Sequence, residues 1–149
     1  MGGSETIEQN VGTGHDGLID ALVQTSFITM SALSKLAADN DLSLTQLRVL
    51  GILRDRRLRM TALADFLGLD KSTMTGLVAR AEGRGLLERA RNPDDGRAVD
   101  VFLSVSGVEL GERIFRDMEQ FLSRATDGLT AGEQNRLRSL LERMLGSRA

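Results

Sequence analysis

Apolar positions spaced three or four residues apart predict helices over much of the chain. The first such stretch covers residues 18–38, a polar break follows at residues 39–41, and a second stretch starts at Leu44. We expect Thr45 to cap this second helix and the charged run 54–59 to end it. The apolar faces of the two helices contain Ile19, Leu22, Val23, Phe27, Met30, Leu33, Ala37, Leu44, Leu47 and Leu50, with Leu53 a further candidate for the second.

Two short helical patterns meet at Gly68, in the middle of the chain. Thr61 is placed to cap the first helix, and Asp70 or Ser72 to cap the second, which runs to about Gly83. Glycine suits the left-handed backbone conformation in which helices often end, so Gly68 marks a tight turn.

Helices joined in this way form a helix-turn-helix if they can cross closely and share apolar anchors. Ala64 is the small residue that allows the close crossing. The expected anchors and core-facing residues are Leu63, Leu67, Leu69, Met74, Leu77, Val78 and Ala81. The same turn occurs in helix pairs that bind no DNA, so the pattern alone leaves both readings open.

A β-hairpin follows, which we call the wing (residues 86–103). Residues 86–91 and 98–103 read as strands, and the Asn-Pro-Asp-Asp-Gly run at 92–96 is typical of a turn. In the second strand, the positions expected to alternate with more exposed ones are Val99, Val101 and Leu103.

Two further helices are predicted at the end of the chain. Ser106 with Glu109, and Thr130 with Glu133, have the spacing of capping boxes. The apolar faces behind them contain Leu110, Ile114, Met118, Phe121, Leu122, Ala125, Leu137, Leu140, Leu141 and Met144. The predicted order is α-α-α-α-β-β-α-α, a mainly α fold with a small β-hairpin.

Composition narrows the function classes. A length of 149 residues favours one domain, and 41% apolar residues suffice for a core. Cysteine is absent and the single histidine is His15, so we expect no disulfide, no metal site, no cofactor and no enzyme. The polar start and the lack of a continuous run of about 18 apolar residues predict neither a signal peptide nor a membrane span, and favour the cytoplasm.

Charge is distributed unevenly along the chain. Residues 48–97 carry eleven Lys or Arg and seven acids, net +4, whereas residues 1–47 carry net −5 and residues 98–149 net −1. The basic middle contains the helix-turn-helix and the wing, and this pattern is compatible with a DNA-binding face on an acidic protein. An arginine-rich surface without a nucleic-acid partner is the alternative.

On the second helix of the motif, small hydroxyl side chains and cations remain on the outer face. They suit contacts to base edges and phosphates in the major groove. Ser72 and Thr73 also fit a purely capping role, and Arg80 fits a phosphate, a base or a salt bridge. The candidate DNA contacts on this helix are Ser72, Thr73, Thr75, Gly76 and Arg80, with Lys71 weaker.

On the wing, Arg97 follows the acidic turn and suits the narrow, electronegative minor groove. We expect Asp95 to orient Arg97 or a neighbouring cation through a charge-assisted hydrogen bond. A structural Asp–Arg pair without DNA contact is the alternative. Arg89 and Arg91 are weaker candidates for phosphate contacts.

Three stretches of the chain together resemble the MarR family of winged-helix transcription regulators. They are LTQLRVLGIL (44–53), TALADFLGLDKSTMTGLVARAEGRGLLER (61–89) and DDGRAVDVFLSVSG (94–107), the last with the family's Asp-x-Arg wing motif at Asp95 and Arg97. The resemblance implies a homodimer held by the terminal helices. It divides the chain into a flexible arm at 1–16, a dimerisation region at 17–43 and 104–149, and a winged helix-turn-helix at 44–103.

The resemblance also implies a small aromatic or amphipathic effector, or none, because the Cys and His used by oxidant- and zinc-sensing members are absent. At Arg48, a basic position common in the family, we expect a structural salt bridge. Ordinary core packing is the alternative for the residues of the implied effector cleft. Those residues are Phe27, Met30, Arg48, Met60, Phe66 and Phe115.

The sequence therefore predicts a ligand-responsive homodimeric repressor that binds an inverted-repeat operator. The alternative is a winged-helix protein-interaction module without specific DNA binding.

Overall fold

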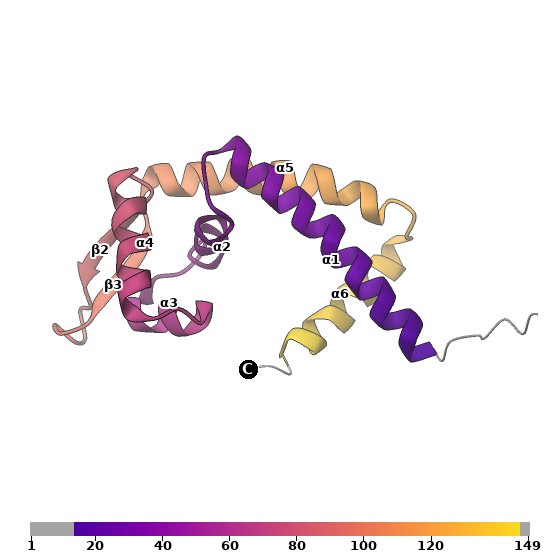
Figure 1. Ribbon diagram of the computed structural model, residues 1–149, viewed down its shortest axis with the longest axis horizontal. Helices are drawn as coiled ribbons and strands as arrows, with labels where there is room; N and C mark the ends of the chain where they lie inside the picture. The colour runs from indigo at the N-terminus through magenta and orange to yellow at the C-terminus, as the bar shows by residue number, and fades with distance from the viewer. Residues whose placement is uncertain (1–13, 147–149) are drawn as a thin grey trace, which may run out of the picture. The chain divides into compact units, whose positions relative to one another are not determined.

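The computed structural model describes residues 14–146 (Figure 1). Its elements are α1 (Gly14–Asp39), α2 (Leu44–Ile52), β1 (Leu58–Arg59), α3 (Met60–Leu67), α4 (Lys71–Gly83), β2 (Leu87–Arg91), β3 (Val99–Leu103), α5 (Val105–Thr126) and α6 (Ala131–Gly146). This confirms the mainly α fold and adds one short strand to the predicted order. Residues 1–13 of the predicted arm at 1–16 lie outside the described residues, and residues 14–16 belong to α1.

The chain divides into two compact units, residues 1–31 and 32–149. In the first, α1 carries a series of exposed apolar side chains, among them Phe27 at 73% and Leu18 at 57% exposure. Gly17–Asp39 is long and apolar enough, at a mean hydropathy of 1.2, to pass a test for membrane spans. One such helix is weak evidence for a membrane span, because the core helix of a soluble protein and a signal sequence have the same length and hydropathy.

In the second unit, α1 ends in contact with the helix-turn-helix. Arg84, which follows α4, donates hydrogen bonds to the backbone carbonyls of Asn40 (3.1 Å) and Asp41. These carbonyls come after the last turn of α1, and Asp41 itself has a positive φ of 54°. Arg84 therefore joins the C-terminal ends of α1 and α4.

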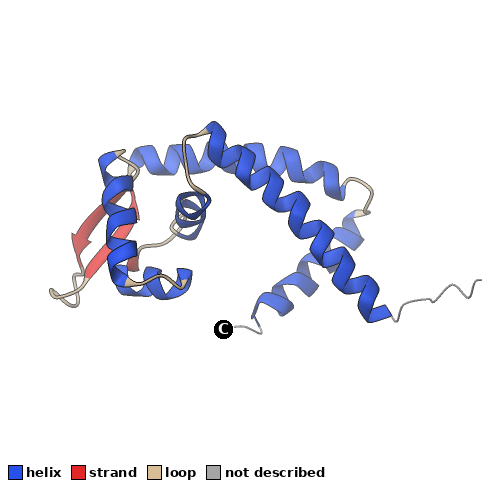
Figure 2. Ribbon diagram, viewed as in Figure 1, coloured by secondary structure: helices blue, strands red, loops and turns tan. Residues whose placement is uncertain are grey.

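The hydrophobic core of the second unit lies between α2, α3, α4, the sheet and the first half of α5 (Figure 2). Leu63, Met74, Val78 and Val101 are each 0% exposed at its centre. Gly107 on α5 is tightly packed, because a Cβ there would lie 2.1 Å from the carbonyl oxygen of Leu86. Glycine is thus required where α5 crosses the start of the wing.

The wing forms as predicted and gains a third strand. The antiparallel order is β1-β3-β2, with Arg59 opposite Asp100 and Leu58 opposite Val101. Strand β1 has only two residues, too few to show an alternating pattern. It forms because β3 offers it a free edge, which is a tertiary effect.

The expected burial pattern of β3 was partly wrong. Val101 is buried as predicted, but Val99 is 39% exposed, whereas Asp100 is only 3% exposed. The carboxylate of Asp100 can be buried because Arg57 and Asn92 both donate hydrogen bonds to it.

Several helix caps differ from the predicted ones. Ser43, not Thr45, caps α2, in a capping box with Gln46. Ser104, not Ser106, caps α5 through a 3.0 Å bond from the amide of Gly107, and α3 begins after Arg59 with no side-chain cap, so Thr61 does not cap it. In each case the helix begins two residues earlier than the predicted cap implied.

The capping box at the start of α6 is confirmed. Thr130 and Glu133 exchange hydrogen bonds between side chain and backbone at 2.8 and 3.3 Å. Hydrogen bonds from the backbone amide and from the side chain of Thr130 lower the pKa of the Glu133 carboxyl below its ordinary value. No residue of α6 is buried in the described chain.

Candidate nucleic-acid interface

The turn between α3 and α4 has the geometry that the sequence predicts. Gly68 adopts the left-handed conformation, with φ 66° and ψ 31°. The amide of Gly68 donates a hydrogen bond to the carbonyl of Asp65 at 3.2 Å, and the amide of Leu69 donates one to the carbonyl of Ala64 at 3.0 Å. The last carbonyls of α3 therefore have hydrogen-bond donors. Leu67 and Leu69 pack against the core at the two ends of this turn.

Asp70 caps α4. Its carboxylate accepts hydrogen bonds from the backbone amide of Thr73 at 2.7 Å and from the Thr73 hydroxyl at 2.9 Å. These bonds lower the pKa of Asp70. The cap is therefore Asp70 and not Ser72, and the Ser72 hydroxyl is exposed and has no hydrogen-bond partner in residues 14–146.

The residues of α4 that were predicted to contact DNA lie on the face that points away from the core. Met74, Leu77, Val78 and Ala81 are buried, as expected. The opposite positions Lys71, Ser72, Thr73, Thr75 and Arg80 are exposed, and Gly76 is half-buried.

Besides Thr73, two more of the predicted contact residues are already engaged with their own helix. The Thr75 hydroxyl donates to the carbonyl of Lys71 at 2.8 Å. Nη1 of Arg80 lies over Gly76, 3.5 Å from where a Cβ would stand. Neither Arg80 nor Lys71 forms an ion pair with any described residue, so the salt-bridge alternative for Arg80 is not what the structure shows.

The turn of the wing, residues 92–98, is held by its own side chains. Oδ1 of Asn92 accepts the backbone amides of Asp94 (2.9 Å) and Asp95 (3.0 Å). Oδ1 of Asp95 in turn accepts the backbone amide of Arg97 at 3.1 Å. The guanidinium of Arg97 is exposed and makes no ion pair within the described part of the chain.

Asp95 orients the backbone of Arg97 and not its guanidinium. The ion-pair partner of Asp95 is Arg59 on β1, at 3.7 Å. The contact of Asp95 with a neighbouring arginine is therefore an ion pair, too long for the expected charge-assisted hydrogen bond, and the side chain of Arg97 stays available.

The sequence did not predict that the carboxylate of Asp100, on strand β3 of the wing, is buried. Oδ2 of Asp100 accepts a bond from Nε of Arg57, and Oδ1 accepts one from Nδ2 of Asn92, both at 2.9 Å. The bonds from Asn92 and Arg57, aided by the nearby charge of Arg59, lower the pKa of Asp100 against the opposing effect of burial. An acid between Val99 and Val101 was the only sign of this site in the sequence.

The two weaker wing candidates differ. Nε of Arg89 forms an ion pair with Glu82 on α4 at 2.5 Å. Arg91 is exposed and has no such partner among the described side chains. Arg91 is thus the one of the two whose charge is open to a phosphate.

Comparisons with known proteins agree with this geometry. A family profile described as the MarR family matches residues 40–98. The transcriptional repressor NicR of Pseudomonas putida is 31% identical over 112 residues, which are 74% of this chain and 71% of NicR. The chain belongs to the MarR family.

Other relatives of this MarR-family chain are also named as regulators. The repressor IacR of Pseudomonas putida is 30% identical over 68% of the chain, and a regulator of Mycobacterium tuberculosis is 36% identical over 49%. The matched part spans 62% of the length of IacR and 51% of that of the mycobacterial protein.

Solved structures of the family share the fold. The transcriptional regulator PA4135 superposes with a TM-score of 0.71 at 28% identity, covering 87% of this chain and 96% of that one. A mutant of MarR from E. coli, solved in complex with operator DNA, superposes with a TM-score of 0.64 at 26% identity over 87% of this chain and 92% of that chain.

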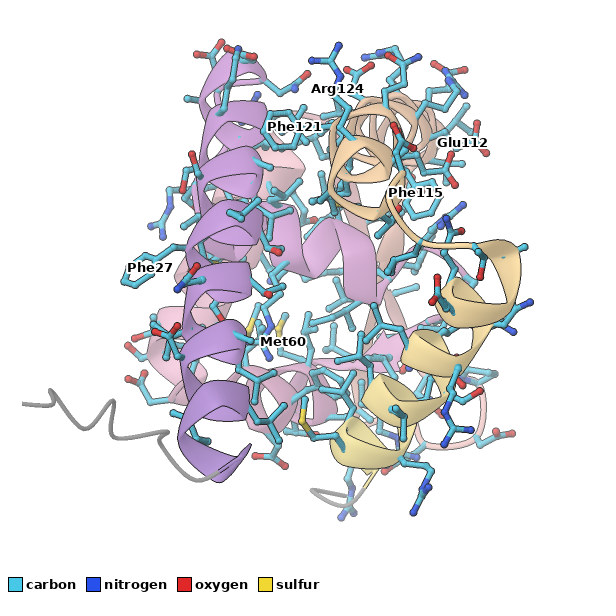
Figure 3. The ribbon with its side chains drawn as sticks, turned by 90° about the vertical axis from the view of Figure 1, so that its right-hand side faces the viewer. Phe27, Met60, Glu112, Phe115, Phe121 and Arg124 are labelled. Atoms are coloured by element: carbon cyan, nitrogen blue, oxygen red, sulfur yellow. The ribbon has the colours of Figure 1, made fainter. Side chains whose placement is uncertain are left out.

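The residues predicted to line an effector cleft in this MarR-family chain differ in burial and in the contacts they make. Met60 is buried in the core, Phe66 is 56% exposed, and Arg48 is exposed without an ion pair in the described residues, so the salt bridge expected there is wrong. Phe115 lies on α5 under the guanidinium of Arg54, 3.8 Å from its ring centroid. Figure 3 shows that Phe115 and Phe121 project from different sides of α5.

The remaining two candidates, Phe27 and Met30, lie in the first unit and are 73% and 46% exposed. A small pocket in the second unit contains none of the six candidates. It is lined by Leu42, Gln46, Val49, Leu50, Leu77, Ala81, Leu86 and Leu87.

Proposed function

We propose that this protein is a sequence-specific DNA-binding transcriptional repressor. The observation that carries the proposal is which cations form ion pairs in the winged helix-turn-helix at residues 44–103, called the winged region below. Arg57, Arg59 and Arg89 are paired with acids, whereas the guanidinium groups of Arg80 and Arg97, at the predicted groove positions, have no acidic partner among the described residues. An exposed, unpaired cation meets a phosphate or base without first breaking an ion pair.

Relatives support this function. NicR and IacR are named as transcriptional repressors, and MarR of E. coli was solved with operator DNA. In this chain the contacts would come from the exposed face of α4 in the major groove and from Arg97 in the minor groove. Ser72 offers a free hydroxyl, and Lys71 and Arg91 offer charges for phosphates. Asp95 would orient the wing, and Arg89 would first have to leave Glu82.

The proposal includes a homodimer that reads an inverted repeat. Leu137, Leu140, Leu141, Met144 and Leu145 of α6 are 39% to 65% exposed, and α1 has an exposed apolar series of its own. Such faces are stabilised when a second chain covers them. A two-fold dimer would read half-sites about 34–36 Å apart.

Response to an effector is the part of the proposal that rests on family membership. We propose a small aromatic or amphipathic ligand whose binding favours a dimer geometry that no longer fits the operator. Thermal-shift screening against phenolic acids, followed by DNA-release assays, tests it. The effector proposal fails if no compound both stabilises the protein and releases DNA.

The test of DNA binding starts from a randomised duplex pool. The wild-type protein is expected to select an inverted repeat, with an affinity that falls steeply as salt rises. A protein-interaction module would select no duplex, and its weak binding to any DNA would be independent of sequence.

A further inference from the structure

Asp100 is the one buried charged residue in the described chain, and it joins β1 to the wing. Each of its carboxylate oxygens has its own donor. Oδ2 accepts from Arg57, which precedes β1, and Oδ1 accepts from Asn92, at the start of the turn, both at 2.9 Å. The carboxylate is thus fully engaged between two segments that are 35 positions apart in sequence.

The hydrogen bonds continue from Asn92 to the backbone of Arg97. While Nδ2 of Asn92 donates to Asp100, its Oδ1 accepts the amides of Asp94 and Asp95. Asp95 then accepts the amide of Arg97, and the amide of Asn92 closes the turn on the carbonyl of Ala98 at 2.9 Å. The orientation of the Asn92 amide group is therefore set from one side by Asp100 and used on the other side by the turn.

Arg57 is itself held in place. Its guanidinium carbon lies 4.6 Å from the ring centroid of Phe102 on β3. A cation over an aromatic face is attracted by the ring, so Arg57 is oriented independently of Asp100. The chain of contacts therefore starts from a fixed point on the sheet.

We propose that Asp100 is a positioning residue for DNA binding: through Asn92 it holds the turn in the conformation that presents Arg97 to the minor groove. This inference rests on the proposed function. Simple strand stability does not call for a carboxylate at this position, since replacing buried ion pairs by apolar residues is often neutral or stabilising. What an apolar residue could not do is fix the amide of Asn92.

The first test needs no DNA. Amide hydrogen exchange is measured by NMR for Asp94 and Asp95 in wild type, in Asp100→Asn and in the control Glu88→Gln. Glu88 is exposed on β2 and makes no hydrogen bond to a described residue, so the control removes the same charge from the same sheet. We expect at least about tenfold faster exchange of both amides in Asp100→Asn and no change in the control.

A swap variant separates the hydrogen-bond chain from the charge. In Asn92→Asp combined with Asp100→Asn, the new Asp accepts the turn amides and a bond from the new Asn, whose oxygen accepts from Arg57. Every donor keeps an acceptor. We expect the exchange rates of the Asp94 and Asp95 amides to return to within about threefold of wild type. Exchange as fast as in Asp100→Asn would contradict the proposed series of hydrogen bonds.

The second test measures affinity for a duplex selected by the wild-type protein. Asp100→Asn is expected to weaken binding about tenfold, Glu88→Gln not to weaken it, and the swap to restore it. In an Arg97→Ala background, Asp100→Asn should cost less than about twofold more, because the residue it positions is gone. Equal losses in both backgrounds would overturn the proposal.

The proposal can also be judged if Asp100→Asn does not fold or if the wild-type protein selects no duplex. If Asp100→Asn fails to fold, Asn92→Ala breaks the same chain at the turn and must show the same exchange and the same coupling to Arg97, or the proposal is wrong. If the wild-type protein selects no duplex, the proposed function fails and takes the DNA role of Asp100 with it. The exchange experiment then still decides whether Asp100 holds the turn.

Discussion

The winged region and helix α6 differ in how far they bury their apolar side chains. In the winged region, apolar side chains such as Leu63 and Met74 are fully buried, and even the buried acid Asp100 has two donors. Helix α6 buries nothing in the described chain and leaves Leu140 47% and Leu145 65% exposed. The comparison indicates that one chain suffices to build the core of the winged region, whereas the apolar face of α6 is the surface that the proposed dimer would cover.

The sharpest contrast is between two Leu→Ala substitutions. Leu63→Ala creates a cavity in the core and is expected to lower the free energy of unfolding by about 3 kcal/mol at every protein concentration. Leu140→Ala should lower the free energy of unfolding only to the extent that the protein is dimeric, so the effect of this substitution should vary with protein concentration. Urea unfolding at several concentrations checks both, and a concentration-independent effect of Leu140→Ala would break the comparison.

A charge on α6 should separate dimerisation from folding. Leu140→Glu places a carboxylate in the proposed interface and is expected to weaken the dimer by about 2 kcal/mol or more, roughly thirtyfold in Kd. Sedimentation equilibrium measures it, with Ser139→Glu on the neighbouring exposed position as the matched control. A dimer untouched by Leu140→Glu would place the interface elsewhere.

Gly107 tests the packing of α5 on the winged region. Because a Cβ at this position would meet the carbonyl oxygen of Leu86 at 2.1 Å, Gly107→Ala is expected to cost about 2 kcal/mol of unfolding free energy. Gly111→Ala, where nothing lies within 4 Å, should be neutral or stabilising. Thermal unfolding distinguishes the two, and equal effects would mean that α5 does not cross the wing this closely.

The helix-turn-helix turn should be more tolerant. Gly68 has a positive φ but open space around its Cα, so Gly68→Ala costs only the backbone strain, about 1 kcal/mol. Asn at this position, which tolerates the left-handed conformation better, should recover part of that loss. Unfolding curves of the two variants provide the check.

The smallest expected effect is on acid stability. Hydrogen bonds lower the folded-state pKa values of Asp70, Asp100 and Glu133 below the ordinary values of 3.8, 3.8 and 4.5. Their stabilisation is complete above those ordinary values and is lost as pH falls through the lowered ones. Asp100→Asn should therefore be less stable than wild type at neutral pH, with the difference shrinking below pH 3.8; a constant difference would contradict this.

Local features were predictable from the sequence and features that depend on distant partners were not. Gly68, the cap of α6 and the buried face of α4 follow from spacing along one helix. Strand β1 needs the edge of β3, so two residues could not reveal it. The caps at Ser43 and Ser104 were missed because Thr45 and Ser106, two residues further on, also carry hydroxyl groups that can cap a helix.

The candidate site divides in the same way. Spacing sufficed to place Ser72, Thr73, Thr75 and Arg80 on the outer face of α4, and the turn chemistry placed Arg97 at the wing. The burial of Asp100 depends on Arg57, 43 residues earlier, and no local pattern could disclose that pair. The six cleft candidates came from a resemblance, and the structure gathers none of them in the small pocket it forms.

The central claim is that the unpaired cations of the winged region bind DNA. It is tested most directly by the salt dependence of binding to a selected duplex, compared between wild type, Arg97→Ala and Arg116→Ala. Arg116 is exposed on α5 and provides the matched loss of charge. We predict that Arg97→Ala weakens binding at least about tenfold and lowers the slope of log K against log salt by about 1, with Arg116→Ala close to wild type. Identical slopes and affinities for Arg97→Ala and wild type would contradict the account.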